Sequence, residues 1–79
     1  MTDKEALKHA IERTLQVYSG EILPEATFET ALGADSIDMA QILKLLEEEL
    51  SITIPTEEWK KVRTVGDAQK LLEQVKSHD

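Results

Sequence analysis

The chain contains no cysteine among its 79 residues. This absence excludes disulfide bonds, thiolate metal sites and cysteine nucleophiles, and it is typical of a reducing compartment such as the cytoplasm, where we expect the protein. No apolar run approaches the ~20 residues of a membrane-spanning helix. The polar start, MTDKEALKH, also lacks the features of a signal peptide. We therefore expect neither export nor membrane insertion.

Basic residues are scarce as well. Nine lysines and arginines stand against sixteen acidic residues, which gives a formal net charge of -7. A nucleic-acid ligand is not expected, because phosphate binding needs a basic surface. Residues 21–59 hold ten of the acids and a single lysine, Lys44. A charged partner should therefore be basic.

The short length leaves room for one domain, which we expect to span residues 1–79 and to be monomeric. A core of this size supplies only about 3–5 kcal/mol of net stability, so the chain must depend on well-patterned helices. An enzyme with a cleft of its own is not expected in so small a domain.

The first helix is predicted over about 3–18. Thr2 and Glu5 have the spacing of a capping box, and apolar residues then recur every three or four positions. Gly20 and Pro24 follow this pattern and indicate that the helix has ended before them.

A second helix is predicted over about 36–50, where Asp35 and Asp38 supply the capping signal. The segment 19–34 shows no helical period, yet it is too apolar for a free linker. We therefore expect a long loop packed onto the core, and long loops of this kind usually have a function.

Two further helices complete the predicted fold. A brief third helix over about 56–62 should bury Trp59, and Thr64 with Asp67 predicts a last helix over about 65–76. No strand alternation is visible. The fold class is therefore all-α: a small four-helix bundle with three longer helices, one short third helix and a long packed loop.

Three features meet at Ser36. Gly33 permits a close approach of the backbone, Asp35 stands at the cap position, and Ser36 lies at the helix N-terminus, where unpaired amides favour an anion. A phosphate on the serine oxygen would be well placed. The alternative is that Ser36 merely starts a helix, and spacing alone favours that alternative.

Catalytic and metal-binding roles have weaker support. The only histidines, His9 and His78, lie in the first helix and at the C-terminus, so no catalytic triad with Ser36 can be assembled. The run Glu47–Glu49 places consecutive helical side chains in different directions, so we expect no metal site.

The chain resembles the acyl carrier proteins. The resemblance rests on ALGADSID followed by an apolar helix, LEEEL, an IP turn with acidic residues, and TVGDA. The family signature D-S-L-D stands here as Asp35, Ser36, Ile37 and Asp38. The resemblance implies that a phosphopantetheinyl transferase moves 4'-phosphopantetheine from coenzyme A onto Ser36, and that Asp35 and Asp38 flank the attachment point. The thiol of that arm would carry acyl groups as thioesters, so the protein would be a tether rather than an enzyme.

Partner enzymes should dock on the second helix. At about 100° per residue, Ile37, Gln41, Lys44 and Glu48 fall opposite the apolar face, with Leu45 beside that row. Asp35, Asp38, Glu47 and Glu48 are expected to form a charged rim around Ile37. The resemblance implies partners such as acyltransferases and ketosynthases with basic docking surfaces. Typical fatty-acid carriers have an acidic residue at Gln41 and an apolar one at Lys44, so a specialised polyketide or secondary-metabolite pathway is plausible beside fatty-acid synthesis.

The resemblance also implies an acyl pocket between the helices. Two of the positions assigned to it, Met39 and Trp59, carry larger side chains than in many fatty-acid carriers, so we expect a short cavity. The residues assigned to the pocket are Phe28, Met39, Leu46, Trp59, Val62, Ala68 and Leu71.

Two other functions remain open. The first is a carrier of aminoacyl groups, as in peptide assembly or D-alanyl transfer. The acidic face is more typical of acyl carriers than of aminoacyl carriers. The second is an adaptor that never receives the arm, which loss of Ser36 or Asp35 would have indicated; both are present.

Overall fold

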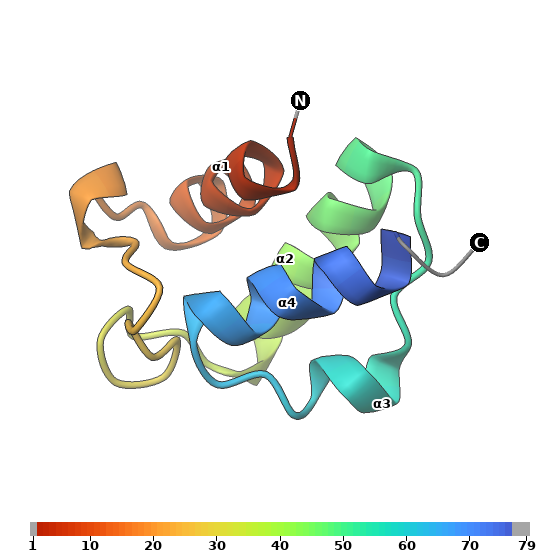
Figure 1. Ribbon diagram of the computed structural model, residues 1–79. Helices are drawn as coiled ribbons and strands as arrows, with labels where there is room; N and C mark the ends of the chain where they lie inside the picture. Colours follow the sequence, from red (N-terminus) through yellow and green to blue (C-terminus); the bar gives the residue numbers. More distant parts are fainter. Residues whose placement is uncertain (1, 77–79) are drawn as a thin grey trace.

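The structure is a computed structural model that describes residues 2–76, and within that range it contains helices and no strand. The all-α prediction is confirmed (Figure 1). One isolated antiparallel bridge joins Thr27 to Thr64. No helix of residues 2–76 is long and apolar enough to cross a membrane. The elements are α1 (Asp3–Leu15), the 3-10 turn η1 (Ser19–Glu21), α2 (Ser36–Leu50), α3 (Thr56–Trp59) and α4 (Val65–Lys76).

The three longer helices enclose the apolar core. α1 packs against both α2 and α4, and the short α3 packs against α4. In Figure 1, α1 and α4 run in opposite directions, and α3 lies below α4. The largest fully buried side chains come from α1, α2 and α4: Leu7, Ile11, Ile42, Leu46 and Leu72. α1 thus buries its apolar face against both α2 and α4.

Local capping decides where the helices begin. Thr2 and Glu5 form a reciprocal capping box at α1, as predicted. At α4 the Asp67 amide donates to the Thr64 hydroxyl (3.1 Å), and the Thr64 amide donates to the Asp67 carboxylate (3.2 Å). These bonds satisfy amides that the first helical turn leaves without partners. They also lower the pKa of Asp67, with the Thr64 and Arg63 amides as the main causes.

The predicted end of the first helix was wrong. α1 ends at Leu15 rather than near residue 18, because Gln16 adopts a left-handed conformation (φ 54°) and its amide closes onto the Glu12 carbonyl. Tyr18 continues the apolar spacing of the helix but lies outside it, with 82% of its surface exposed.

The third helix is also shorter than predicted, since α3 ends at Trp59 and not near residue 62. Its single turn is too short to be stable alone. Trp59 holds it in place: the side chain is 4% exposed and its indole N–H donates to the Met39 carbonyl oxygen at 2.9 Å. The ring also lies 6.3 Å from that of Phe28, at a tilt of 54°.

The loop between α1 and α2 is packed onto the core, as predicted. Ile22, Phe28 and Leu32 are buried. Backbone hydrogen bonds tie the loop to the start of α4, from the Val65 amide to the Ala26 carbonyl and from the Gly66 amide to the Pro24 carbonyl. This loop leads directly into the N-terminus of α2 and therefore fixes its position.

Candidate functional site

Ser36 is the first residue of α2, and its side chain is exposed. Asp35 and Asp38 form the predicted capping box around it: the Asp38 amide donates to the Asp35 carboxylate at 2.8 Å, and the Asp35 amide donates to Asp38 at 3.2 Å. Gly33 has a φ of 70°, a left-handed conformation that favours glycine in the turn before the helix. The predicted close approach of the backbone was wrong, because among the described residues no atom beyond its chain neighbours lies within 4 Å of the position that a Cβ would take. The backbone on both sides of the serine is therefore fixed while its hydroxyl faces solvent.

The start of α2 is suited to a negatively charged group. Within residues 2–76, the backbone N–H groups of Ser36 and Ile37 donate to no protein acceptor. These amides and the positive end of the helix dipole favour an anion close to the Ser36 oxygen. A phosphodiester attached to that oxygen would receive this stabilisation without rearrangement of the helix.

Two hollows open beside Ser36. One has a volume of about 590 Å³ and extends over the loop to Phe28 and Ala34. The other has a volume of about 320 Å³ and extends between α2 and α3 to Trp59. Met39 and Val62 line both hollows. A flexible group attached to Ser36 could therefore lie along either side of this apolar pair.

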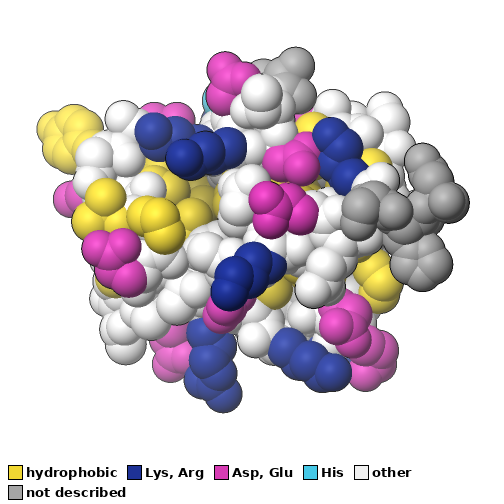
Figure 2. All heavy atoms as spheres, in the orientation of Figure 1, with side chains coloured by type: hydrophobic (Ala, Val, Ile, Leu, Met, Phe, Trp, Pro, Cys, Tyr) yellow, Lys and Arg dark blue, Asp and Glu magenta, His cyan; other side chains and the backbone are white. Residues whose placement is uncertain are grey.

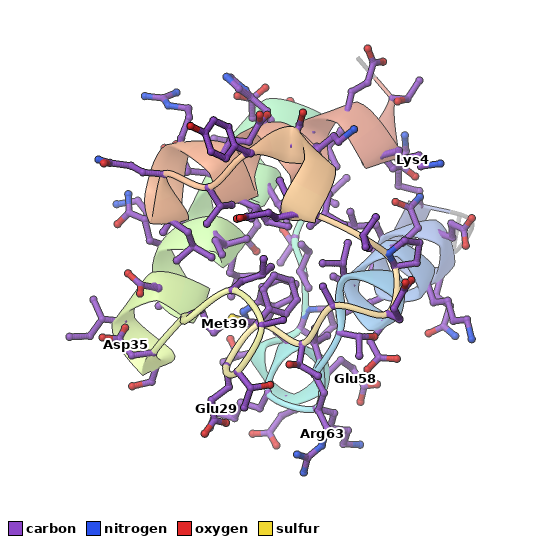
Figure 3. All side chains as sticks on the ribbon, turned by 90° about the vertical axis from the view of Figure 1, so that its left-hand side faces the viewer. Lys4, Glu29, Asp35, Met39, Glu58 and Arg63 are labelled. Atoms are coloured by element: carbon purple, nitrogen blue, oxygen red, sulfur yellow. The ribbon has the colours of Figure 1, made fainter. Side chains whose placement is uncertain are left out.

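Charged side chains of both signs surround the first hollow. Glu29 and Asp35 stand at its edge together with Lys60 and Arg63. In Figure 3, Met39 points inward from α2, whereas Asp35 lies at the outer end of the helix. The surroundings of Ser36 are therefore less uniformly acidic than the sequence segment suggested.

The predicted exposed row on α2 has the expected exposure. Ile37 is 77% exposed, and Gln41, Lys44 and Glu48 are exposed as well. Glu47 differs, because it is partly buried and accepts a hydrogen bond from the Ile54 amide at 2.8 Å. Its carboxylate therefore holds the connection after α2.

His9 and the Glu47–Glu49 run, which were considered for catalysis and metal binding, do not lie beside Ser36. His9 pairs with Glu49 at 3.3 Å, near the end of α2 opposite to Ser36. With a rise of about 1.5 Å per residue, roughly 20 Å of helix separates this pair from the serine. His78 lies outside the described residues. No cluster of three metal-ligating side chains occurs within residues 2–76.

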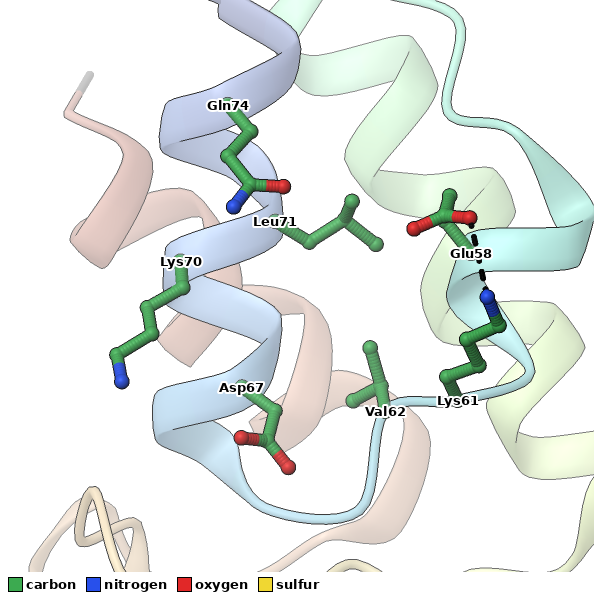
Figure 4. Close-up of a pocket in the computed structure, with 7 residues that line it drawn as sticks. All are labelled: Glu58, Lys61, Val62, Asp67, Lys70, Leu71 and Gln74. Atoms are coloured by element: carbon green, nitrogen blue, oxygen red, sulfur yellow. Dashed lines mark hydrogen bonds and ion pairs between the residues drawn. The ribbon is translucent and has the colours of Figure 1, made fainter.

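The residues assigned to an acyl pocket are only partly brought together. Phe28, Met39, Trp59 and Val62 line the hollows beside Ser36. Leu71 points with Val62 into a different hollow of about 200 Å³ between α3 and α4 (Figure 4). Leu46 and Ala68 are fully buried in the core and line none of these hollows.

Several residues around the site were missed from the sequence. Lys60 and Arg63 reach the hollow beside Ser36 from after α3, and Arg13 and Thr14 of α1 line a hollow of about 340 Å³ next to Ile37. The Thr14 hydroxyl is a buried polar atom that has no hydrogen-bond partner among residues 2–76. The sequence carries no spacing signal that could place these residues near α2, because tertiary packing alone brings them there.

Comparison with known proteins decides the family. The family profile described as a phosphopantetheine attachment site matches residues 5–72, which is most of the chain. The chain belongs to the acyl carrier protein family. The solved structure of a candidate acyl carrier protein from Mycobacterium tuberculosis is similar to it, with a TM-score of 0.84 and 29% identity over 92% of this chain and 97% of that one.

Membership of the family defines the prosthetic group of this carrier, which is covalent 4'-phosphopantetheine. When attached, the group supplies a thiol that holds cargo as a thioester. The structure fits it, because the start of α2 offers an exposed hydroxyl, unpaired amides and adjoining hollows. Members of the family carry intermediates and do not catalyse their conversion.

Proposed function

We propose that Ser36 is the attachment residue and that the carrier delivers acyl thioesters to biosynthetic enzymes. The observation that supports this proposal is the position of an exposed serine at the first residue of a capped helix, between two hollows. In the transfer reaction the Ser36 oxygen would form a bond to the β-phosphorus of coenzyme A. The bond to the nucleotide phosphate would break, and the hydroxyl proton would pass to a base of the phosphopantetheinyl transferase.

The chain's own contribution is to position the serine. The capping box of Asp35 and Asp38 holds the backbone, so the Cβ of Ser36 is presented to the transferase in a fixed direction. The unpaired amides of the first turn then stabilise the new phosphodiester charge. A tether of this kind raises the effective concentration of the cargo at each partner enzyme.

Partner enzymes would dock on the exposed row of α2. Ile37 offers an apolar anchor next to Ser36, and Asp38 and Glu48 supply acidic contacts for a basic surface. Gln41 and Lys44 give the row a mixed character. We therefore propose fatty-acid or polyketide biosynthesis as the pathway, with a specialised secondary-metabolite route favoured by these two residues. A monomer in the cytoplasm is the form that the small acidic domain supports.

The attachment residue can be tested by intact mass. Incubation with coenzyme A and a transferase of broad specificity should add one phosphopantetheine to the wild type and none to Ser36→Ala. Ser51 is the matched control, because it is an exposed serine at the opposite end of the same helix. Ser51→Ala should be modified like the wild type. If Ser36→Ala is modified, or if the wild type is not, Ser36 is not the attachment residue.

A loading assay separates acyl from aminoacyl cargo. The modified protein is offered to acyltransferases with malonyl or fatty-acyl donors and, in parallel, to adenylation enzymes with amino acids. We expect acyl thioesters in the first set only. Aminoacyl loading alone would replace the acyl proposal with the aminoacyl one and leave the attachment site unaffected.

A further inference from the structure

A second surface lies between α1 and α4, away from Ser36. It is a groove of about 520 Å³, within the size range of small-ligand sites. Its floor is aliphatic and is formed by Leu7, Ile22, Pro24 and Val65. Leu23, which stands between two of these residues, is 47% exposed and extends the apolar area.

Lysines stand around this floor. Lys4, Lys8 and Lys70 line the groove, against one acidic residue, Glu73. Within residues 2–76, Lys4 and Lys8 form no hydrogen bond or ion pair, and Lys70 has an electrostatic attraction to Asp67. Figure 2 looks onto this side of the molecule, where hydrophobic side chains gather at the left with cationic side chains directly above them. The groove is therefore locally cationic in a chain of net charge -7.

The groove has a polar and an apolar end. The ion pair between Lys76 and Asp3 (2.7 Å) places the C-terminus of α4 beside the N-terminus of α1. The lysines of α1 therefore lie toward that end, whereas Pro24, whose carbonyl accepts from the Gly66 amide (2.8 Å), lies at the other. A ligand with an anionic head and an aliphatic body would match both ends at once. Among residues 2–76, no aromatic ring lines the groove, which suits a flexible chain rather than a planar ligand.

We propose that this groove binds an anionic aliphatic amphiphile, with a carboxylate or phosphate head at Lys4 and Lys8 and its chain on the floor of Leu7, Ile22 and Val65. The lysine stems would cover the chain while their ammonium groups meet the head. Asp35 and Lys4 lie on opposite sides of the molecule in Figure 3. The site is therefore separate from the attachment serine and does not depend on its modification.

Sodium decanoate below its critical micelle concentration is the probe. It is titrated into the ¹⁵N-labelled, unmodified full chain and followed by amide chemical shifts. We expect shifts at the N-terminal half of α1, around Ile22 and along α4. Decyl sulfate should act in the same way, and decyltrimethylammonium should produce no shifts there. Shifts confined to Met39, Trp59 and Val62 would overturn the proposal, because the chain would then occupy the hollows beside Ser36.

Charge-matched variants test the role of the lysines. Lys4→Gln/Lys8→Gln removes two charges from the groove while it keeps two polar stems, and it should weaken decanoate binding about 5-fold, as two exposed ion pairs allow. Lys60→Gln/Arg63→Gln removes the same charge beside Ser36, outside the groove, and should leave the affinity unchanged. Equal weakening in both double variants would show only a net-charge effect and would overturn the site.

Vesicles distinguish a free ligand from a lipid. Flotation is compared for phosphatidylcholine vesicles with and without phosphatidylglycerol. Binding of decanoate without flotation identifies a free amphiphile as the ligand, and flotation that needs phosphatidylglycerol, Lys4 and Lys8 identifies a lipid head group; either result supports the proposed chemistry. The absence of both overturns it.

Discussion

Replacement of Trp59 by phenylalanine should destabilise the carrier strongly while leaving it folded. The side chain is 4% exposed, and its indole N–H donates to the Met39 carbonyl at 2.9 Å, so it fastens the single turn of α3 to α2. Loss of this hydrogen bond costs about 0.5–1.5 kcal/mol. Loss of the apolar surface of the second ring costs about 1–2 kcal/mol more.

The expected sum, roughly 2–3 kcal/mol, is large against the ~3–5 kcal/mol that a core of this size provides. The melting temperature should fall by about 8–24 °C, since each kcal/mol corresponds to about 4–8 °C in a domain of this length. Trp59→Ala would cost about 3–5 kcal/mol and should leave little folded protein.

Urea unfolding followed by circular dichroism measures the effect without need of the tryptophan signal. Tyr18→Phe is the control, because 82% of the surface of Tyr18 is exposed. Removal of its hydroxyl should therefore leave the free energy of unfolding unchanged. If Trp59→Phe unfolds at the same urea concentration as Tyr18→Phe, the bond to Met39 does not fasten α3.

Other changes test the site and its surroundings. Asp35→Ala removes the cap of α2 and should cost about 1 kcal/mol in urea unfolding and slow phosphopantetheine transfer; a stable, fully reactive variant would argue against the role of the cap. Ile37→Ala should leave stability unchanged, because the side chain is 77% exposed, but should raise the KM of partner enzymes in turnover assays. Folding lowers the pKa of Asp67 from its ordinary value of 3.8. The ionised carboxylate therefore stabilises the fold above pH 3.8, and this contribution is lost as the pH falls through the lower pKa of the folded state. Asp67→Asn should therefore make the free energy of unfolding less dependent on pH at the acid end of the range. Loading with long saturated acyl chains should raise the melting temperature by less than about 4 °C, because Leu46 and Ala68 are fully buried and line neither hollow beside Ser36.

The helix starts could be predicted from the sequence because capping is local. Asp35 and Asp38 are three residues apart, and their side chains need only each other's backbone. The helix ends were harder, since Gln16 rather than glycine takes the left-handed position after α1. Apolar spacing through Tyr18 then suggested a longer helix than the chain forms.

The prediction of the site had the same limits. Ser36 and the exposed row of α2 follow from one helix, whose faces can be worked out from its period. Lys60 and Arg63 approach Ser36 only through the turn after α3, and the division of the apolar residues between core and hollows depends on the packing of all four helices. Such contacts join residues that are far apart in the chain, and no local pattern encodes them.

The long loop between α1 and α2 is attached to the rest of the protein through backbone hydrogen bonds. Its hydrogen bonds to the start of α4, and the bond from the Phe28 amide to the Arg63 carbonyl, do not depend on side-chain identity. Glu25, Glu29 and Ala31 are exposed on this loop. Glu29 lines the hollow beside Ser36, so a substitution of this residue can change the charge there while the same loop path is kept. Partner preference can therefore evolve in the loop independently of the residues that form the core.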